Sequence, residues 1–338
     1  MKLGDLSITY VEVMANAIRR FGHDPAPLLN QYRIQPETLA SPDTRISIPR
    51  YMRLGHDAIA LTQKPWLGLE MGSQTHAVHL GLAGLVAMTA PDVRHACQAI
   101  AGFELLSSFN SRGSSAFVTQ SGQSVLRFYS VSPYNDYNLF VVDSVLSAWS
   151  HILKSITDHT GAIVARVDIE FPAPPYADVY SRYFNCPVTF NAQHNQLVLH
   201  SGALSFPVRQ HSASVWEGLR QQALKELEKT RLGLSMAERV ARTLSPLLNG
   251  ETPELPEVAQ RLNMAPWTLR RRLQAEGLTY QDVLNKTRQE LAESYVRDTS
   301  LTLGEVAYLL GFGSAAAFQR AFKRWTGEPP GRYREHCR

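Results

Sequence analysis

Two stretches of the chain share one pattern: Leu255-Pro-Glu-Val-Ala-Gln-Arg-Leu-Asn-Met264 and, 48 residues later, Leu303-Gly-Glu-Val-Ala-Tyr-Leu-Leu-Gly-Phe312. A basic segment follows each copy, Trp-Thr-Leu-Arg-Arg-Arg-Leu at 267–273 and Ala-Phe-Gln-Arg-Ala-Phe-Lys-Arg-Trp at 317–325. A short helix, a turn and a second, basic helix form a helix-turn-helix unit. The repeat therefore predicts two such units in tandem, with DNA as the partner.

The residue types inside each copy fit this arrangement. Asn263 and Gly311 occupy equivalent turn positions, and Asn and Gly enter the left-handed backbone region most easily. Apolar residues at 258, 259 and 262, and again at 306, 307 and 310, would hold the second helix of each unit. The side chains then expected to face outward are Trp267, Arg270 and Arg271 in the first unit, and Ala315, Ala316, Gln319, Arg320 and Lys323 in the second. An isolated basic triplet such as 270–272 is usually a solvated helix face, but its place on the second helix of a unit favours DNA contact.

Helix-start signals support the same spacing. Thr302 and Glu305 predict a capping box, and Thr279 can start a long helix that continues to about residue 297. At 1.5 Å per residue this helix spans roughly 28 Å. It could hold two recognition helices about one DNA turn, roughly 34 Å, apart.

Residues from about Ser235 to Arg334 strongly resemble the DNA-binding domain of AraC/XylS-family transcription regulators, above all over Gly311–Arg334. The resemblance implies an all-α, seven-helix domain with two helix-turn-helix units. It places base contacts at Trp267, Arg270, Arg271, Ala315, Ala316 and Arg320, and phosphates near Thr302 and Arg324. Two departures matter. Ala265 stands where the family commonly has a capping serine, and Ala315 and Ala316 favour thymine methyl contacts over hydrogen bonding.

Composition sets wider bounds. The chain has 338 residues, enough for two domains, and a formal net charge of +4. Residues 229–338 hold 17 Lys and Arg against 12 Asp and Glu, a net +5, whereas residues 1–228 hold 17 against 18. No apolar run approaches the roughly 20 residues that span a bilayer, and residues 1–7 lack the apolar core of a secretory signal. We expect a cytoplasmic protein without membrane contact, whose three distant cysteines, Cys97, Cys186 and Cys337, form neither a disulfide framework nor a zinc site.

The first part of the chain mixes helix and strand patterns. Helical periodicity covers 8–21, 51–61, 96–109 and 137–156, and strands are predicted at 115–120, 124–131 and 163–171. Alternation over 163–171, with Arg166, Asp168 and Glu170 on the wet face, predicts an antiparallel sheet. We therefore predict an α+β sensor domain at 1–210, a connector helix at 211–232 and the DNA-binding domain at 233–338. The connector, with Val215, Leu219, Leu224 and Leu227 as its apolar positions, could pack on its own domain or form a dimer contact.

The segments 28–37 and 48–50 resemble the arabinose-binding-type sensor domain of an AraC/XylS subgroup that includes an ornithine-utilisation regulator. This resemblance implies a small-molecule effector. The expected pocket residues are Phe103, Arg127, Tyr134, Tyr137 and Phe140, with Phe128 and Trp149 adding to the aromatic density; core packing is the competing role for each. Asp143 could be a buried anchor or part of a solvated face. His76 and His79 have no third ligand nearby, so we expect no metal and no cofactor.

Three functions compete. The leading one is an effector-controlled, sequence-specific transcription regulator that binds promoter DNA and contacts RNA polymerase, possible as a homodimer; the resemblance favours activation. The alternative is a DNA-associated enzyme, such as a repair or modifying protein with an AraC-type domain, but no cysteine, phosphate-loop or nucleophile motif supports it. A purely architectural DNA binder would need no sensor domain.

Overall fold

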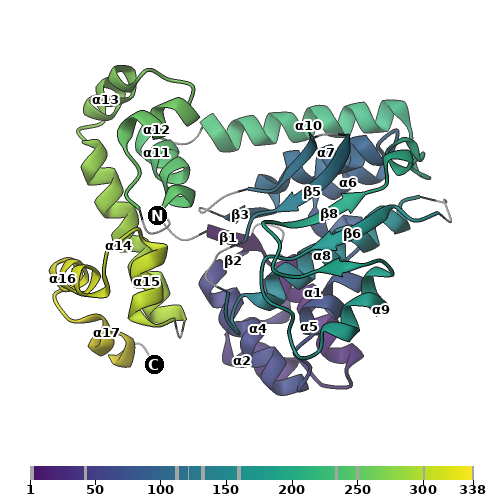
Figure 1. The fold of residues 1–338 in the computed structure, drawn as a ribbon, viewed down its shortest axis with the longest axis horizontal. Helices are drawn as coiled ribbons and strands as arrows, with labels where there is room; N and C mark the ends of the chain where they lie inside the picture. Colours follow the sequence, from purple (N-terminus) through teal and green to yellow (C-terminus); the bar gives the residue numbers. More distant parts are fainter. Residues whose placement is uncertain are drawn as a thin grey trace.

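The computed structural model describes residues 4–41, 44–110, 114–120, 122–130, 134–157, 161–232, 235–248, 251–299 and 301–336. The N-terminal part combines two sheets with helices, and the C-terminal part is helical, as the sequence predicts (Figure 1). Its N-terminal helices are α1 Thr9–Arg20, α2 Ala26–Gln31, α3 Pro36–Leu39, α4 Ile48–Thr62, α5 Leu67–Ser73, α6 Leu82–Met88, α7 Val93–Gly102, α8 Leu139–Ser155 and α9 Tyr180–Phe184. No helix among the described residues has the length and apolar character needed to cross a bilayer.

The strands form two sheets. The smaller has the order β2-β1-β3 and is antiparallel, with β1 Gly4–Ser7, β2 Arg45–Ser47 and β3 Ser108–Asn110. The larger has the order β4-β5-β8-β6-β7, with β4 Ala116–Gln120, β5 Gln123–Phe128, β6 Val164–Asp168, β7 Val188–Thr189 and β8 Asn195–Leu199. Its strands are antiparallel except for the parallel pair β6 and β7. The sheet is therefore mixed, and the antiparallel sheet predicted from 163–171 is correct for the pairing of β6 with β8 but not with β7.

Two local predictions need correction. The helix expected over 96–109 ends at Gly102, because residues 108–110 pair with β1 as strand β3. The alternation over 163–171 is only partly right, because Ile163, Val167, Ile169 and Phe171 are buried as expected but Asp168 is not on a wet face. A register shift between Val164 and Arg166 interrupts it, and Asp168 is buried, where Arg166 Nε donates to its carboxylate at 2.6 Å.

A long helix, α10 Ala213–Leu232, lies along the N-terminal part and leads to the helical C-terminal part (Figure 1). Its buried positions are Ala223 and Leu227, whereas Val215 is 50% and Leu224 is 39% exposed. The expected apolar stripe was therefore half wrong. Leu219 and Leu227 pack against the N-terminal core as expected, together with Trp216 and Ala223, which lie outside the expected stripe.

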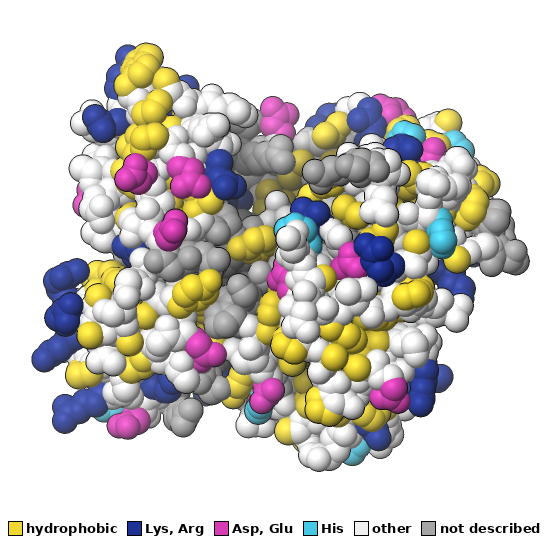
Figure 2. Space-filling model, viewed as in Figure 1, with side chains coloured by type: hydrophobic (Ala, Val, Ile, Leu, Met, Phe, Trp, Pro, Cys, Tyr) yellow, Lys and Arg dark blue, Asp and Glu magenta, His cyan; other side chains and the backbone are white. Residues whose placement is uncertain are grey.

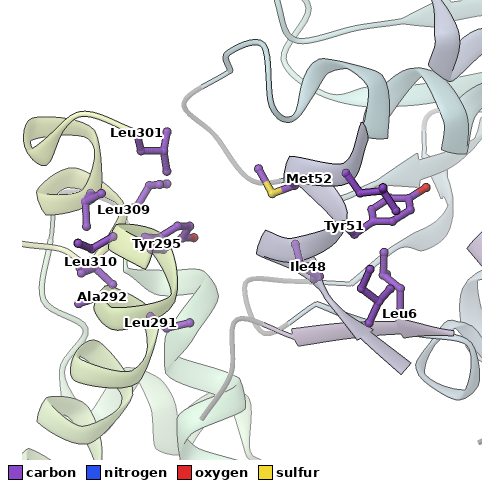
Figure 3. Packing of buried hydrophobic residues seen from close by; sticks show 14 of the residues in the cluster. Leu6, Ile48, Tyr51, Met52, Leu291, Ala292, Tyr295, Leu301, Leu309 and Leu310 are labelled. Atoms are coloured by element: carbon purple, nitrogen blue, oxygen red, sulfur yellow. The ribbon is translucent and has the colours of Figure 1, made fainter. Parts of the chain in front are cut away.

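Seven α-helices form the described C-terminal part: α11 Met236–Leu244, α12 Leu255–Arg261, α13 Pro266–Ala275, α14 Tyr280–Asp298, α15 Leu303–Leu309, α16 Ala315–Thr326 and α17 Pro330–His336. Buried residues of β1 and α4 belong to the same hydrophobic cluster as buried residues of α14 (Figure 3). Leu6, Ile48 and Met52 contribute from the N-terminal side, and Leu291 and Tyr295 from α14. The two parts therefore pack on each other through an apolar contact.

Candidate DNA interface and ligand cavity

The first repeat folds as α12, a turn and α13. Asn263 supplies the turn with a φ of 54°, and the Met264 amide donates to the Ala259 carbonyl at 2.9 Å. Leu269 and Leu273 are fully buried on the inner face of α13, in one cluster with Val258 and Ala259. The outer face of α13 is left to its polar residues and tryptophan.

The second repeat has the same form in α15, a turn and α16. Gly311 has a φ of 67°, and a Cβ at this position would lie 2.2 Å from the Glu251 carbonyl oxygen. Both the backbone conformation and the close approach therefore require glycine. Phe318 and Phe322 are fully buried on the inner face of α16, with ring centroids 5.6 Å apart.

Arg288 on α14 fastens this second turn, and sequence reasoning missed it. Its side chain is 8% exposed and donates to the carbonyls of Leu310 at 2.8 Å and Gly311 at 2.7 Å. It also donates to the Thr252 hydroxyl at 2.9 Å, and the guanidinium lies 4.8 Å from the Phe312 ring centroid. Burial lowers the pKa of Arg288. Because these contacts cross from α14 to residues more than 20 positions away, no local motif reveals them.

Helix starts follow the predicted chemistry. Thr302 and Glu305 form a capping box at α15, and Thr279 and Asp282 form one at α14. Ala265 makes no side-chain cap at α13, as its apolar side chain implies. Ser314 caps α16 by accepting from the Ala317 amide at 3.2 Å, a cap that the sequence analysis did not name.

The residues expected to contact DNA are on the surface of the C-terminal part. Trp267 is 65% exposed, and Arg271 lies 5.8 Å above its ring. Ala315 is half-buried, and the remaining eight are exposed: Arg270, Arg271, Thr302, Ala316, Gln319, Arg320, Lys323 and Arg324. Within the described residues, none of the five arginine and lysine side chains in this list forms an ion pair. These five side chains can therefore form ion pairs with the phosphates of a polyanion such as DNA.

Helices α13 and α16 are the two expected recognition helices. They lie at opposite ends of α14, on the side of the molecule away from the N-terminal part (Figure 1). Lys and Arg side chains project from the same margin, most densely around α16 and α17 (Figure 2). Helix α14 has 19 residues and at 1.5 Å per residue is roughly 28 Å long, so it keeps the two helices well apart. Two basic helices held this far apart suit neighbouring major-groove segments.

A second site lies inside the N-terminal part. A cavity of about 80 Å³ is lined from β1, α1, α4, α5, α7 and α8, among other segments. Phe128 and Trp149 line it, with ring centroids 6.0 Å apart. Its polar lining residues are Tyr10, Tyr51, Thr75, Glu104, Ser107, Ser108, Ser130, Asn138 and Ser144. Burial raises the pKa of the Glu104 carboxyl and raises the pKa of Tyr10 to about 12.

None of the five expected effector residues lines this cavity. Phe103 and Phe140 are buried in the core, and Tyr137 stacks on His56 at 4.2 Å. Arg127 donates from Nε and Nη2 to the Gln196 side chain at 3.1 Å, and Tyr134 accepts from Asn195 at 2.7 Å. The sequence prediction rested on aromatic residues from 103 to 149, whereas the lining is collected from many segments, with α8 and α4 contributing the most residues.

Among the described residues, the histidine and cysteine side chains do not form a metal-binding cluster. His76 lies 5.7 Å from His79 between ring centroids, and the described residues contain no group of three or more potential metal ligands. Cys97 is buried, and burial raises the pKa of the Cys186 thiol to about 11. Cys337 lies outside the described residues.

Comparison with known proteins identifies both parts of the chain. The model for the arabinose-binding domain of AraC transcription regulators matches residues 22–208, and a helix-turn-helix domain model matches residues 258–336. An ornithine utilization regulator of Pseudomonas aeruginosa is 28% identical over 97% of this chain and 96% of its own. The HTH-type transcriptional regulator VirS of Mycobacterium tuberculosis is 26% identical over 99% and 98%. The crystal structure of the transcriptional regulator CdpR from Pseudomonas aeruginosa is similar with a TM-score of 0.45 and 23% identity, over 95% of this chain and 97% of that one.

Proposed function

The chain belongs to the AraC transcription regulators with an arabinose-binding N-terminal domain, and from this membership we propose a sequence-specific DNA-binding regulator controlled by a small molecule. Residues 233–338 bind promoter DNA, residues 1–210 bind the effector and residues 211–232 connect them. The relatives that cover nearly the whole chain are named as regulators, which favours regulation over catalysis. Family membership further supports an activator that contacts RNA polymerase and acts as a homodimer.

One observation carries the DNA-binding role: two recognition helices at the ends of α14 present exposed cations on one side of the molecule. The two helices have different tasks. On α13, Arg270 and Arg271 can each donate two hydrogen bonds to a guanine, a discrimination of about 1–3 kcal/mol per good pair. On α16, Ala315 and Ala316 offer methyl groups, so this helix relies on Arg320 for direct base recognition and on other cations for backbone contact.

The test is a comparison of footprints. DNA fragments recovered by genome-wide mapping of the bound sites would be incubated with the wild-type protein and with the Arg270→Ala and Arg271→Ala variants. We expect each arginine variant to lose about five- to a hundredfold in affinity for the specific site, because the guanine contact is lost. Ala315→Ser serves as the matched control on the other recognition helix, with a smaller effect. An unchanged footprint in both arginine variants, or bound sites without a shared motif, would reject the proposal.

If the cavity binds the effector, helix α4 connects it to the DNA-binding part. Helix α4 lines the cavity with Tyr51 and Met52, and the next residue, Arg53, donates from its guanidinium to the Arg297 carbonyl on α14. An effector changes DNA binding only if it binds the two forms of the protein with different affinity. A ligand that moves α4 satisfies this condition, because it also changes the contact with α14.

A further inference from the structure

The wall of the N-terminal cavity contains a hydroxyl group without a hydrogen-bond partner. Tyr51 is 2% exposed, and its Oη has no partner among the described residues. Folded proteins pair almost all buried polar atoms, so an exception needs a reason. The Tyr51 hydroxyl points away from α14 and into the N-terminal part (Figure 3). The Tyr51 ring packs against the rings of Tyr10 and Phe140, with centroid distances of 6.5 Å and 5.5 Å.

The remainder of the lining excludes one kind of ligand. Among the residues that the structure describes, the lining contains no Lys, Arg or His, and its one acidic residue is Glu104. Both Glu104 oxygens already accept hydrogen bonds from Ser115, at 2.7 Å from the amide and 2.6 Å from the hydroxyl. A carboxylate ligand would therefore lie in an apolar space without a cation and close to another acid. Burial of an unpaired anion is strongly unfavourable.

We propose that this cavity binds a compact, uncharged and mainly apolar molecule that accepts a hydrogen bond from Tyr51 Oη, and that it rejects carboxylates, α-amino acids included. The proposal deepens the proposed function, because it names the chemical class of the effector. An apolar cavity of about 150 Å³ accommodates benzene. The present volume of about 80 Å³ is about half of this, so a six-membered ring requires the flexible side chains of Met52 and Met71 to move aside.

Two compounds with the same ring test the class. Cyclohexanol carries a hydroxyl group and cyclohexanecarboxylate carries an anion on the same ring, and L-ornithine represents the charged amino acids. Calorimetric titration of the full chain measures the affinity for each compound. We expect cyclohexanol to bind, and we expect no binding of cyclohexanecarboxylate or L-ornithine. Binding of the carboxylate or of L-ornithine in competition with cyclohexanol, or no binding of cyclohexanol, would overturn the proposal.

A variant at the hydroxyl separates recognition from folding. Tyr51→Phe keeps the ring and removes an unpaired hydroxyl, so the empty protein should be as stable as the wild type or more stable. Its affinity for cyclohexanol should fall by roughly three- to tenfold, because one neutral hydrogen bond is lost. Tyr183→Phe is the matched control: its hydroxyl donates to Glu70 at 2.7 Å outside the cavity, and affinity should be unchanged. Equal affinity in Tyr51→Phe and the wild type would reject the role of Tyr51.

Failure of the ligand proposal can be distinguished from failure of the proposed regulatory function. Ala83 on α6 lines the cavity and is 1% exposed, so Ala83→Leu fills the space and should abolish cyclohexanol binding. Footprinting of the ligand-free protein is measured in parallel. Specific footprints without cyclohexanol binding would overturn the ligand class alone. Cyclohexanol binding without any specific footprint would support the cavity and reject the regulator.

Discussion

Asp143 is a carboxylate in a setting that ordinarily excludes charge. It lies in the second turn of α8 with no exposed surface, and its Oδ1 accepts a hydrogen bond from Tyr180 Oη at 2.8 Å. Its Oδ2 has no partner among the described residues. The sequence left open whether Asp143 was a buried anchor or part of a solvated face, and the structure selects the buried position. Burial raises the pKa of this carboxyl to about 8.

This raised pKa predicts a stability that depends on pH. The pKa of Asp143 is about 8 in the folded protein and about 3.9 in the unfolded chain. Its contribution is fully present below about pH 4 and is lost as the pH rises through 8. Asp143→Asn keeps the shape and cannot ionise. Urea unfolding at pH 5 and pH 8.5 measures the unfolding free energy of the variant relative to the wild type. We expect this difference to rise by on the order of 2–4 kcal/mol from pH 5 to pH 8.5, in favour of the variant.

Asp178→Asn provides the matched control, because the Asp178 side chain is 72% exposed. Its unfolding free energy, relative to the wild type, should be the same at both pH values. If Asp143→Asn also showed no pH-dependent difference, the carboxylate would have to be ionised at little cost in the folded protein. The burial argument would then be wrong.

At the scale of helices and strands, the sequence predicted the features that depend on near neighbours. A capping box joins residues three positions apart, so Thr302 and Glu305 were sufficient to predict the start of α15. The register shift in β6 and the buried face of α10 depend on partners from distant segments. Arg288 is the clearest case, because its carbonyl acceptors are 22 and 23 residues away. Its sequence context is that of an ordinary exposed arginine on a polar helix.

The two recognition helices differ at the N-cap, the residue just before the helix, and this difference predicts opposite effects of two substitutions. Ala265→Ser supplies the missing cap of α13 and should stabilise the protein by about 1 kcal/mol. Ser314→Ala removes the cap of α16 and should destabilise it by about the same amount. Chemical unfolding checks both. Ala316→Ser, an exposed position inside α16, is the control and should bring no gain; a gain there equal to that of Ala265→Ser would refute the capping explanation.

At the scale of the whole molecule, one helix joins the two candidate sites. Residues of α4 line the cavity on one side and share a hydrophobic cluster with α14 on the other (Figure 3). The sequence could not predict this, because the cavity collects side chains from Leu6 to Trp149. Periodicity identifies which residues of a helix are buried, but it does not say whether they meet a core, a cavity or another domain.

Arg53 tests whether α4 and α14 are coupled. Arg53→Ala removes the hydrogen bond to the Arg297 carbonyl, in the last turn of α14. We expect faster amide hydrogen exchange in the last two turns of α14, residues 291–298, because their packing against α4 is weakened. The recognition helices should retain their exchange rates and the footprint should remain, since the hydrogen bond that is removed ends on the Arg297 carbonyl of α14. Arg50→Ala is the matched control: Arg50 is on the same helix but donates to the Tyr32 carbonyl within the N-terminal part. Equal exchange of residues 291–298 in both variants would show that α4 does not transmit a change in the cavity through Arg53.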